Sequence, residues 1–245
     1  MTQRDPSPRR ISCGLLLLSV LLAISAAPAW GDTTYSIEPV KLRASAGLPE
    51  SVLGILRPQG TRLIADSNGS KTAICEIFWA QQIATQDGTA APKQLLYASL
   101  KPGTLVGIVH FLVIQQYVRD FRSQTIKPGY YTMRYATVMG GMSGNEPRNS
   151  VALVPARDDR SVEPVMPIAD LVRRSELAFH TKGPAVMSLV EVDTDMKDFP
   201  GVITDDEGTC VLQVKVRVKS LKNDRSQDLP LAIVLVTSIP EDSGS

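Results

Sequence analysis

The stretch TCVLQVKVRVKS (209–220) decides the fold class. Apolar side chains occupy alternate positions from Cys210 to Val218, and the positions between them from Gln213 to Lys219 are polar. A period of two is typical of a strand with one buried face. The polar segment 221–228 follows, and then LPLAIVLVTS (229–238), in which Leu231 to Val236 is apolar on both faces. The two runs predict a C-terminal antiparallel hairpin.

Earlier segments repeat this pattern. TRLIADSNGSKTAICEIFWA (61–80) predicts two strands joined at Asn68-Gly69, a dipeptide typical of tight turns. In the second of these strands we expect Ala73, Cys75 and Trp79 to share a face with Ile77. Further strands are predicted over 104–113, 130–138, 151–154 and 185–192.

A helix is predicted in MPIADLVRRSELA (166–178), where Pro167 suits a first helical turn. Many strands with one short helix predict an all-β fold, an antiparallel β-sandwich that is Ig-like or jelly-roll-like. We expect a single sandwich domain over 30–245, with a helical insertion near 165–180.

The segment 1–29 has the features of a secretory signal peptide. Arg4, Arg9 and Arg10 precede the apolar run ISCGLLLLSVLLAI (11–24), and Ala27 and Ala29 form an A-x-A cleavage pattern. The alternative is an uncleaved anchor, but the run is short against the roughly 20 residues that span a bilayer. We therefore expect an exported protein, periplasmic or extracellular, that does not span a membrane after cleavage.

Export has a consequence for the cysteines. Cys13 would be removed with the signal peptide, which leaves Cys75 and Cys210. Two cysteines in an exported chain predict a disulfide. The alternative is two separate buried thiols.

Several chemistries find no support in the sequence. The balance of 26 Lys+Arg against 25 Asp+Glu argues against a nucleic-acid partner. His110 and His180 lack metal-ligand spacing, and Ser143 in GGMSGNE (140–146) breaks the G-x-S-x-G pattern at its last position. The acidic stretch DTDMKD (193–198) lacks the closing Glu of a calcium loop. We assign no catalytic residue, no metal and no cofactor.

Lys-Pro-Gly occurs at 101–103 and again at 127–129, each time before a predicted strand. Pro followed by Gly suits the two central positions of a type II turn. The alternative is a pair of lysines arranged for an anionic ligand. Lys215, Arg217 and Lys219 form a basic stripe that would suit an anionic polysaccharide or lipid headgroup, or would only protect a sheet edge.

Four blocks carry a resemblance to a known group: LLYASLKPGTLVGIVHF (95–111), DFRSQTIKPGYYTMRYA (120–136), HTKGPAVMSLVEV (180–192) and LPLAIVLV (229–236). In this order they resemble exported bacterial proteins of unassigned function that share a Y/F-R-x-Q-x-I-K-P-G-x-Y-T-L-R-Y block. The resemblance implies export and a β-rich fold, and it supplies no activity. The chain departs from the group in the loop 140–149, which contains no histidine.

In the second block Arg122, Gln124 and Arg134 would form a polar cluster if the preceding loop folds back over the strand. Such a cluster suits a carboxylate or a sulfate. The alternative is that Arg134 pairs with an acid such as Asp120 and holds the loop in place.

These observations favour a non-enzymatic β-sandwich that binds a ligand or partner, which would be an envelope component or an anionic molecule. The first alternative is a hydrolase or lyase that acts on envelope polysaccharide. The second is a structural component of the envelope or surface.

Overall fold

The fold comes from a computed structural model, which describes residues 33–43, 48–86, 97–112, 126–139, 147–159, 163–206, 208–220 and 225–236. All of them belong to the compact unit Gly31–Ser245. Its helices are α1 (Glu50–Leu53) and α2 (Ile168–Phe179). The strands are β1 (Thr34–Lys41), β2 (Gln59–Ser67), β3 (Ser70–Trp79), β4 (Ile83–Thr85), β5 (Leu105–Phe111), β6 (Gly129–Met139), β7 (Pro147–Pro155), β8 (Val186–Val190), β9 (Gly201–Thr204), β10 (Cys210–Ser220) and β11 (Ser226–Val236).

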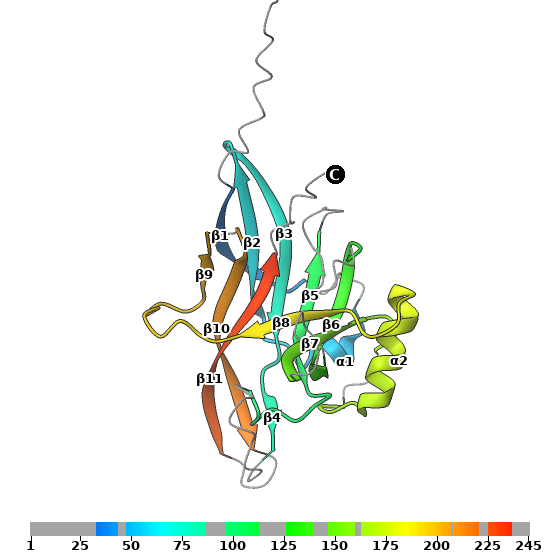
Figure 1. The fold of residues 1–245 in the computed structure, drawn as a ribbon. Helices are drawn as coiled ribbons and strands as arrows, with labels where there is room; N and C mark the ends of the chain where they lie inside the picture. The colour runs from blue at the N-terminus through cyan, green and yellow to red at the C-terminus, as the bar shows by residue number, and fades with distance from the viewer. Residues whose placement is uncertain are drawn as a thin grey trace, which may run out of the picture. The chain divides into compact units, whose positions relative to one another are not determined.

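The strands form a single sheet in the order β1-β2-β3-β5-β6-β7-β8-β11-β10-β4, and β9 pairs with β10 (Figure 1). The strand pairs of the described residues are antiparallel except β4–β10. Because β1 also lies against β9, the sheet is nearly closed and barrel-like. The predicted antiparallel all-β class is confirmed, and the C-terminal hairpin is β10–β11.

The core lies on the face that the alternating pattern indicates, with one local difference in β3. Cys75, Ile77 and Trp79 are buried in the main apolar cluster, as expected. Opposite them, Leu63 pairs with Cys75 and Ile64 pairs with Ala73, so Ile74 is an extra residue in β3. This bulge brings Ile74 rather than Ala73 into the core, because one inserted residue reverses the alternation.

The helix predicted near 165–180 is α2, which begins after Pro167 and ends at His180 in a left-handed conformation. It packs against β7 and buries Leu171 in a second apolar cluster. The sequence did not predict the short α1, which places Val52 against β3 and β5 in a third cluster. No helix of the described residues combines the length and the apolar character needed to cross a membrane.

The two Lys-Pro-Gly turns differ in how much they need glycine. Gly103 has a φ of +86°, and a Cβ at this position would collide with the backbone carbonyl oxygen of Met166. Gly129 has a φ of +142°, but a Cβ there would meet only ordinary contacts. The first turn therefore requires glycine for its backbone angle and for close packing, and the second for its backbone angle alone.

Candidate functional site

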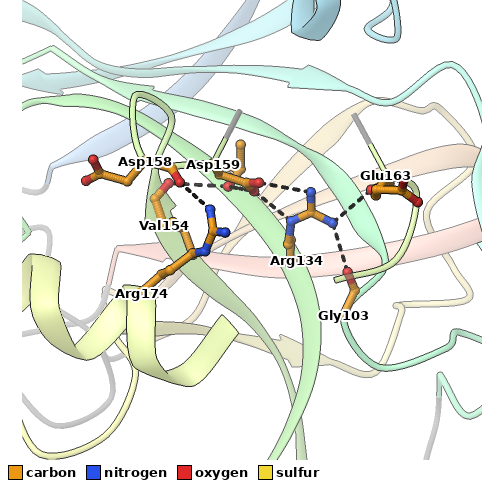
Figure 2. A network of polar contacts seen from close by, with 8 residues as sticks. Gly103, Arg134, Val154, Asp158, Asp159, Glu163 and Arg174 are labelled. Atoms are coloured by element: carbon orange, nitrogen blue, oxygen red, sulfur yellow. Dashed lines mark hydrogen bonds and ion pairs between the residues drawn. The ribbon is translucent and has the colours of Figure 1, made fainter. Parts of the chain in front are cut away.

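Arg134 lies in a fully buried ion pair. Its Nε donates to Asp159 Oδ2 at 2.6 Å and its Nη2 donates to Asp159 Oδ1 at 3.2 Å (Figure 2). Both side chains are 0% exposed. The carbonyl oxygens of Gly103 and Glu163 accept hydrogen bonds from Nη1 at 3.0 and 3.3 Å. One arginine on β6 thus holds the first Lys-Pro-Gly turn and, at Asp159 and Glu163, the connection between β7 and α2 against the sheet.

The carboxylate of Asp159 has a second donor on the same strand. Thr132 Oγ1 donates to Asp159 Oδ2 at 2.6 Å. Nearby, Arg174 of α2 donates to the carbonyl oxygen of Asp158 (Figure 2). A buried ion pair is favourable only when further hydrogen bonds satisfy its remaining groups, and this one meets that condition. The network therefore acts as a structural clamp.

Of the predicted cluster of Arg122, Gln124 and Arg134, only Arg134 belongs to the residues that the structure describes. Arg122, Gln124 and the alternative partner Asp120 lie outside the described residues. Among the described residues the acid that Arg134 contacts is Asp159, and no periodic pattern marks that residue in the sequence. Arg134 has no exposed surface, and its described contacts are made to Asp159, Gly103 and Glu163.

Cys75 and Cys210 are both buried and are free thiols in the structure. They belong to the same apolar cluster. Burial raises the pKa of Cys210 to about 12. Burial also raises the pKa of Cys75, and the neighbouring Cys210 raises it further. The two thiols are thus close enough to interact, and a disulfide between them stays a prediction.

The two histidines lie in different parts of the fold. His180 ends α2 with a φ of 54°, while His110 lies on β5 beside Glu76. Within the described ranges, no three His, Cys, Asp or Glu side chains are grouped so that they could hold a metal ion.

A cavity of about 700 Å³ opens where the sheet fails to close. We call it the seam cavity. Its walls come from β1, from the start of β2, from the end of β3, from the residue before β9 and from β10. The apolar part of the lining consists of Ile37, Pro39, Pro58, Trp79, Pro200 and Val214. Glu38, Arg57, Gln59 and Thr61 supply the polar part.

Arg57 connects the two sides of the seam cavity. Its Nη1 donates to the carbonyl oxygen of Lys215 at 3.2 Å, which links the approach to β2 with β10. Trp79 is buried at the end of β3, and its indole Nε1 finds no acceptor among the described residues. Buried polar groups normally have a hydrogen-bond partner. This donor is therefore available to an acceptor that reaches it.

Only part of this cavity could be predicted from the sequence. Alternation in 73–79 correctly predicted that Trp79 faces the core. Nothing in the sequence indicated that β1 approaches β9, because β1 and β9 were not predicted as strands. The chain matches no protein-family model, no curated protein and no solved structure.

Proposed function

We propose that the protein is an exported, non-enzymatic binding protein that holds a small, mainly apolar molecule in the seam cavity. The observation that carries this proposal is the cavity itself, which lies between β1, at one end of the sheet order, and β10. In this proposal the strands form the two facing layers of a β-sandwich, and the seam between β1 and β9 is its entrance.

The size and lining of the cavity support this ligand class. Small-molecule sites enclose roughly 300–1,000 Å³ and are mostly apolar, with few polar groups that fix orientation. The seam cavity has about 700 Å³ and three proline rings among its apolar walls. Arg57 at its polar side would orient a ligand that carries an acceptor group.

Tryptophan fluorescence tests the proposal directly, because Trp30 and Trp79 are the two tryptophans of the chain. In a Trp30→Phe variant of the segment 30–245, emission reports on Trp79 alone. The uncharged apolar probe N-phenyl-1-naphthylamine should quench that emission saturably. Ile37→Glu, which places a charge in the cavity wall, should weaken binding about tenfold or more, a loss of about 1.4 kcal/mol or more.

Ile168→Glu provides the matched control, since Ile168 is an exposed apolar residue on α2 and does not line the cavity. This variant should bind the probe within about twofold of the parent, a difference of about 0.4 kcal/mol. Unsaturable quenching, or equal losses in both variants, would contradict the proposal. The polysaccharide hydrolase or lyase and the structural envelope component stay alternative hypotheses.

A further inference from the structure

A line of polar side chains crosses the sheet, beginning at Glu38 beside the seam cavity and leading away from it. It takes one residue from each of β1, β2, β3, β5 and β6, and each lies directly opposite the next in the register. We call this line the polar row: Glu38, Arg62, Glu76, His110 and Tyr130. Directly opposed side chains on one face of a sheet are close enough to interact.

Arg62 is neutralised within the row. Its Nη1 donates to Glu38 Oε1 at 2.7 Å. Its Nε and Nη2 both donate to Glu76 Oε1, at 3.0 and 2.6 Å. Hydrogen bonding to Glu76 is the main reason that the pKa of Arg62 is raised. Because Arg62 is already paired with two carboxylates, we do not expect it to bind a further anion.

The other end of the row is a stacked ring pair. The rings of His110 and Tyr130 lie 3.8 Å apart between centroids and are nearly parallel, at 9°. His110 Nδ1 lies 3.5 Å from Glu76 Oε2, the carboxylate oxygen that Arg62 does not contact. The Nε2 of His110 has no partner among the described residues. The stack and Glu76 thus fix the ring while one nitrogen stays available.

A pocket of about 280 Å³ lies beside these rings, and we call it the row pocket. Arg62, Glu76, His110 and Tyr130 line it together with Lys41, the last residue of β1, and Arg43, which follows two positions later. Neither Lys41 nor Arg43 has a hydrogen bond or ion pair with the described residues. With Glu76 and Arg62 paired to each other, these two cations leave the pocket with an excess of positive charge.

Arg43 also lies near the ring pair. Burial and then Glu76 raise the pKa of the Tyr130 hydroxyl, and Arg43 acts in the opposite direction. A guanidinium group presents paired donors that match the two oxygens of a carboxylate or phosphate. Lys41 adds an ammonium group, and His110 adds a ring nitrogen.

We propose that the row pocket binds the oxyanion group of a small ligand, a carboxylate or a phosphate, with Arg43 and Lys41 as its charged contacts. The Glu38–Arg62–Glu76 part of the row holds His110 and Tyr130 in position and does not contact the anion. The site is separate from the seam cavity and independent of the ligand proposed there.

The histidines provide a direct readout, because His110 lines the row pocket and His180 does not. Their ring proton signals can be followed by NMR while D-glucuronate or inorganic phosphate is added at fixed pH and ionic strength. The His110 signal should shift saturably and the His180 signal should not. The anion that binds more tightly identifies the ligand as a sugar acid or as a phosphate compound.

Arg43→Ala should weaken this binding about tenfold or more, a loss of about 1.4 kcal/mol or more. Arg43 is exposed, so the variant should fold normally. Lys101→Ala removes an exposed lysine at the first Lys-Pro-Gly turn and serves as the charge-matched control, with a change below about twofold. The proposal is overturned if neither anion gives a saturable His110 shift, if His180 responds equally, or if both variants lose affinity alike.

Discussion

The Arg134 clamp and the polar row use the same groups in different surroundings. Each has an arginine that shares its donors between a carboxylate and a second acceptor, and each connects neighbouring parts of one sheet. Arg134 and Asp159 are 0% exposed, whereas Arg62 and Glu38 are 30% and 44% exposed. Burial therefore separates a group that holds loops in place from a group that solvent reaches.

The difference has an energetic basis. A buried charge that loses its partner cannot be solvated, so breaking a buried pair costs far more than the pair contributes in net terms. An exposed pair exchanges its partner for water at little cost. Substitutions in the clamp should therefore destabilise the protein strongly, while substitutions in the polar row should leave the protein folded.

Asp159→Ala should produce the largest effect. It leaves Arg134 buried without its carboxylate and should lower the free energy of unfolding by about 3–5 kcal/mol in urea titrations. The adjacent Asp158→Ala is the control, because that side chain is 49% exposed and only its backbone carbonyl binds Arg174. It should change stability by less than about 0.5 kcal/mol. Equal effects at the two positions would contradict the buried clamp.

Gly103→Ala tests the turn that the clamp holds. A left-handed backbone costs a residue with a Cβ about 1–2 kcal/mol, and the collision with the Met166 carbonyl adds about 1–3 kcal/mol. Gly69→Ala isolates the first cost, since Gly69 has a φ of +82° and open space around it. Thermal unfolding should place Gly103→Ala clearly below Gly69→Ala, and coinciding midpoints would refute the close contact.

The core contains ionisable groups without a charged partner, the two thiols. Both have raised pKa values in the folded chain, so the unfolded chain loses its thiol protons first as the pH rises above 9. The contribution of the two thiols to stability should be constant well below that pH. It should then fall by about 1.4 kcal/mol per pH unit for each free thiol, measured by urea unfolding between pH 9 and 10.

Cys210→Ala should remove one thiol's share of that slope. A disulfide between Cys75 and Cys210 would remove the contribution of both thiols, so comparing the parent with Cys210→Ala decides between the bond predicted from the sequence and the free thiols of the structure.

Glu38→Ala should have the smallest effect. It removes one of the two carboxylates on Arg62, and exposed ion pairs contribute about 0.2–1 kcal/mol. Glu76 retains both of its hydrogen bonds to Arg62. Urea unfolding at low and high salt provides the measurement, because screening should abolish the difference. A loss above about 2 kcal/mol would mean that the row carries the fold as the clamp does.

How far the sequence predicts the molecule depends on the range of the interaction. Alternation in 209–220 and 229–236 predicted β10–β11, because one buried face determines every second residue. It failed at Ile74, where an inserted residue shifts the register, and at Gln213, which is buried although the pattern placed it outward.

Residues that come into contact only in the folded chain show no local pattern in the sequence. Asp159 follows β7, 25 positions from Arg134, and neither spacing nor periodicity joins them. The seam cavity depends on β1 lying against β9, which are short or weakly patterned strands from opposite ends of the domain. The polar row depends on register across neighbouring strands, and register was not predicted.

Paired double-mutant cycles test the central claim most directly. Arg134 with Asp159, and Arg62 with Glu38, should each be replaced singly and together by alanine, with unfolding free energies measured in urea. We expect a coupling energy of about 2–3 kcal/mol for the buried pair and below about 1 kcal/mol for the exposed pair. Equal coupling energies in the two cycles would contradict the account.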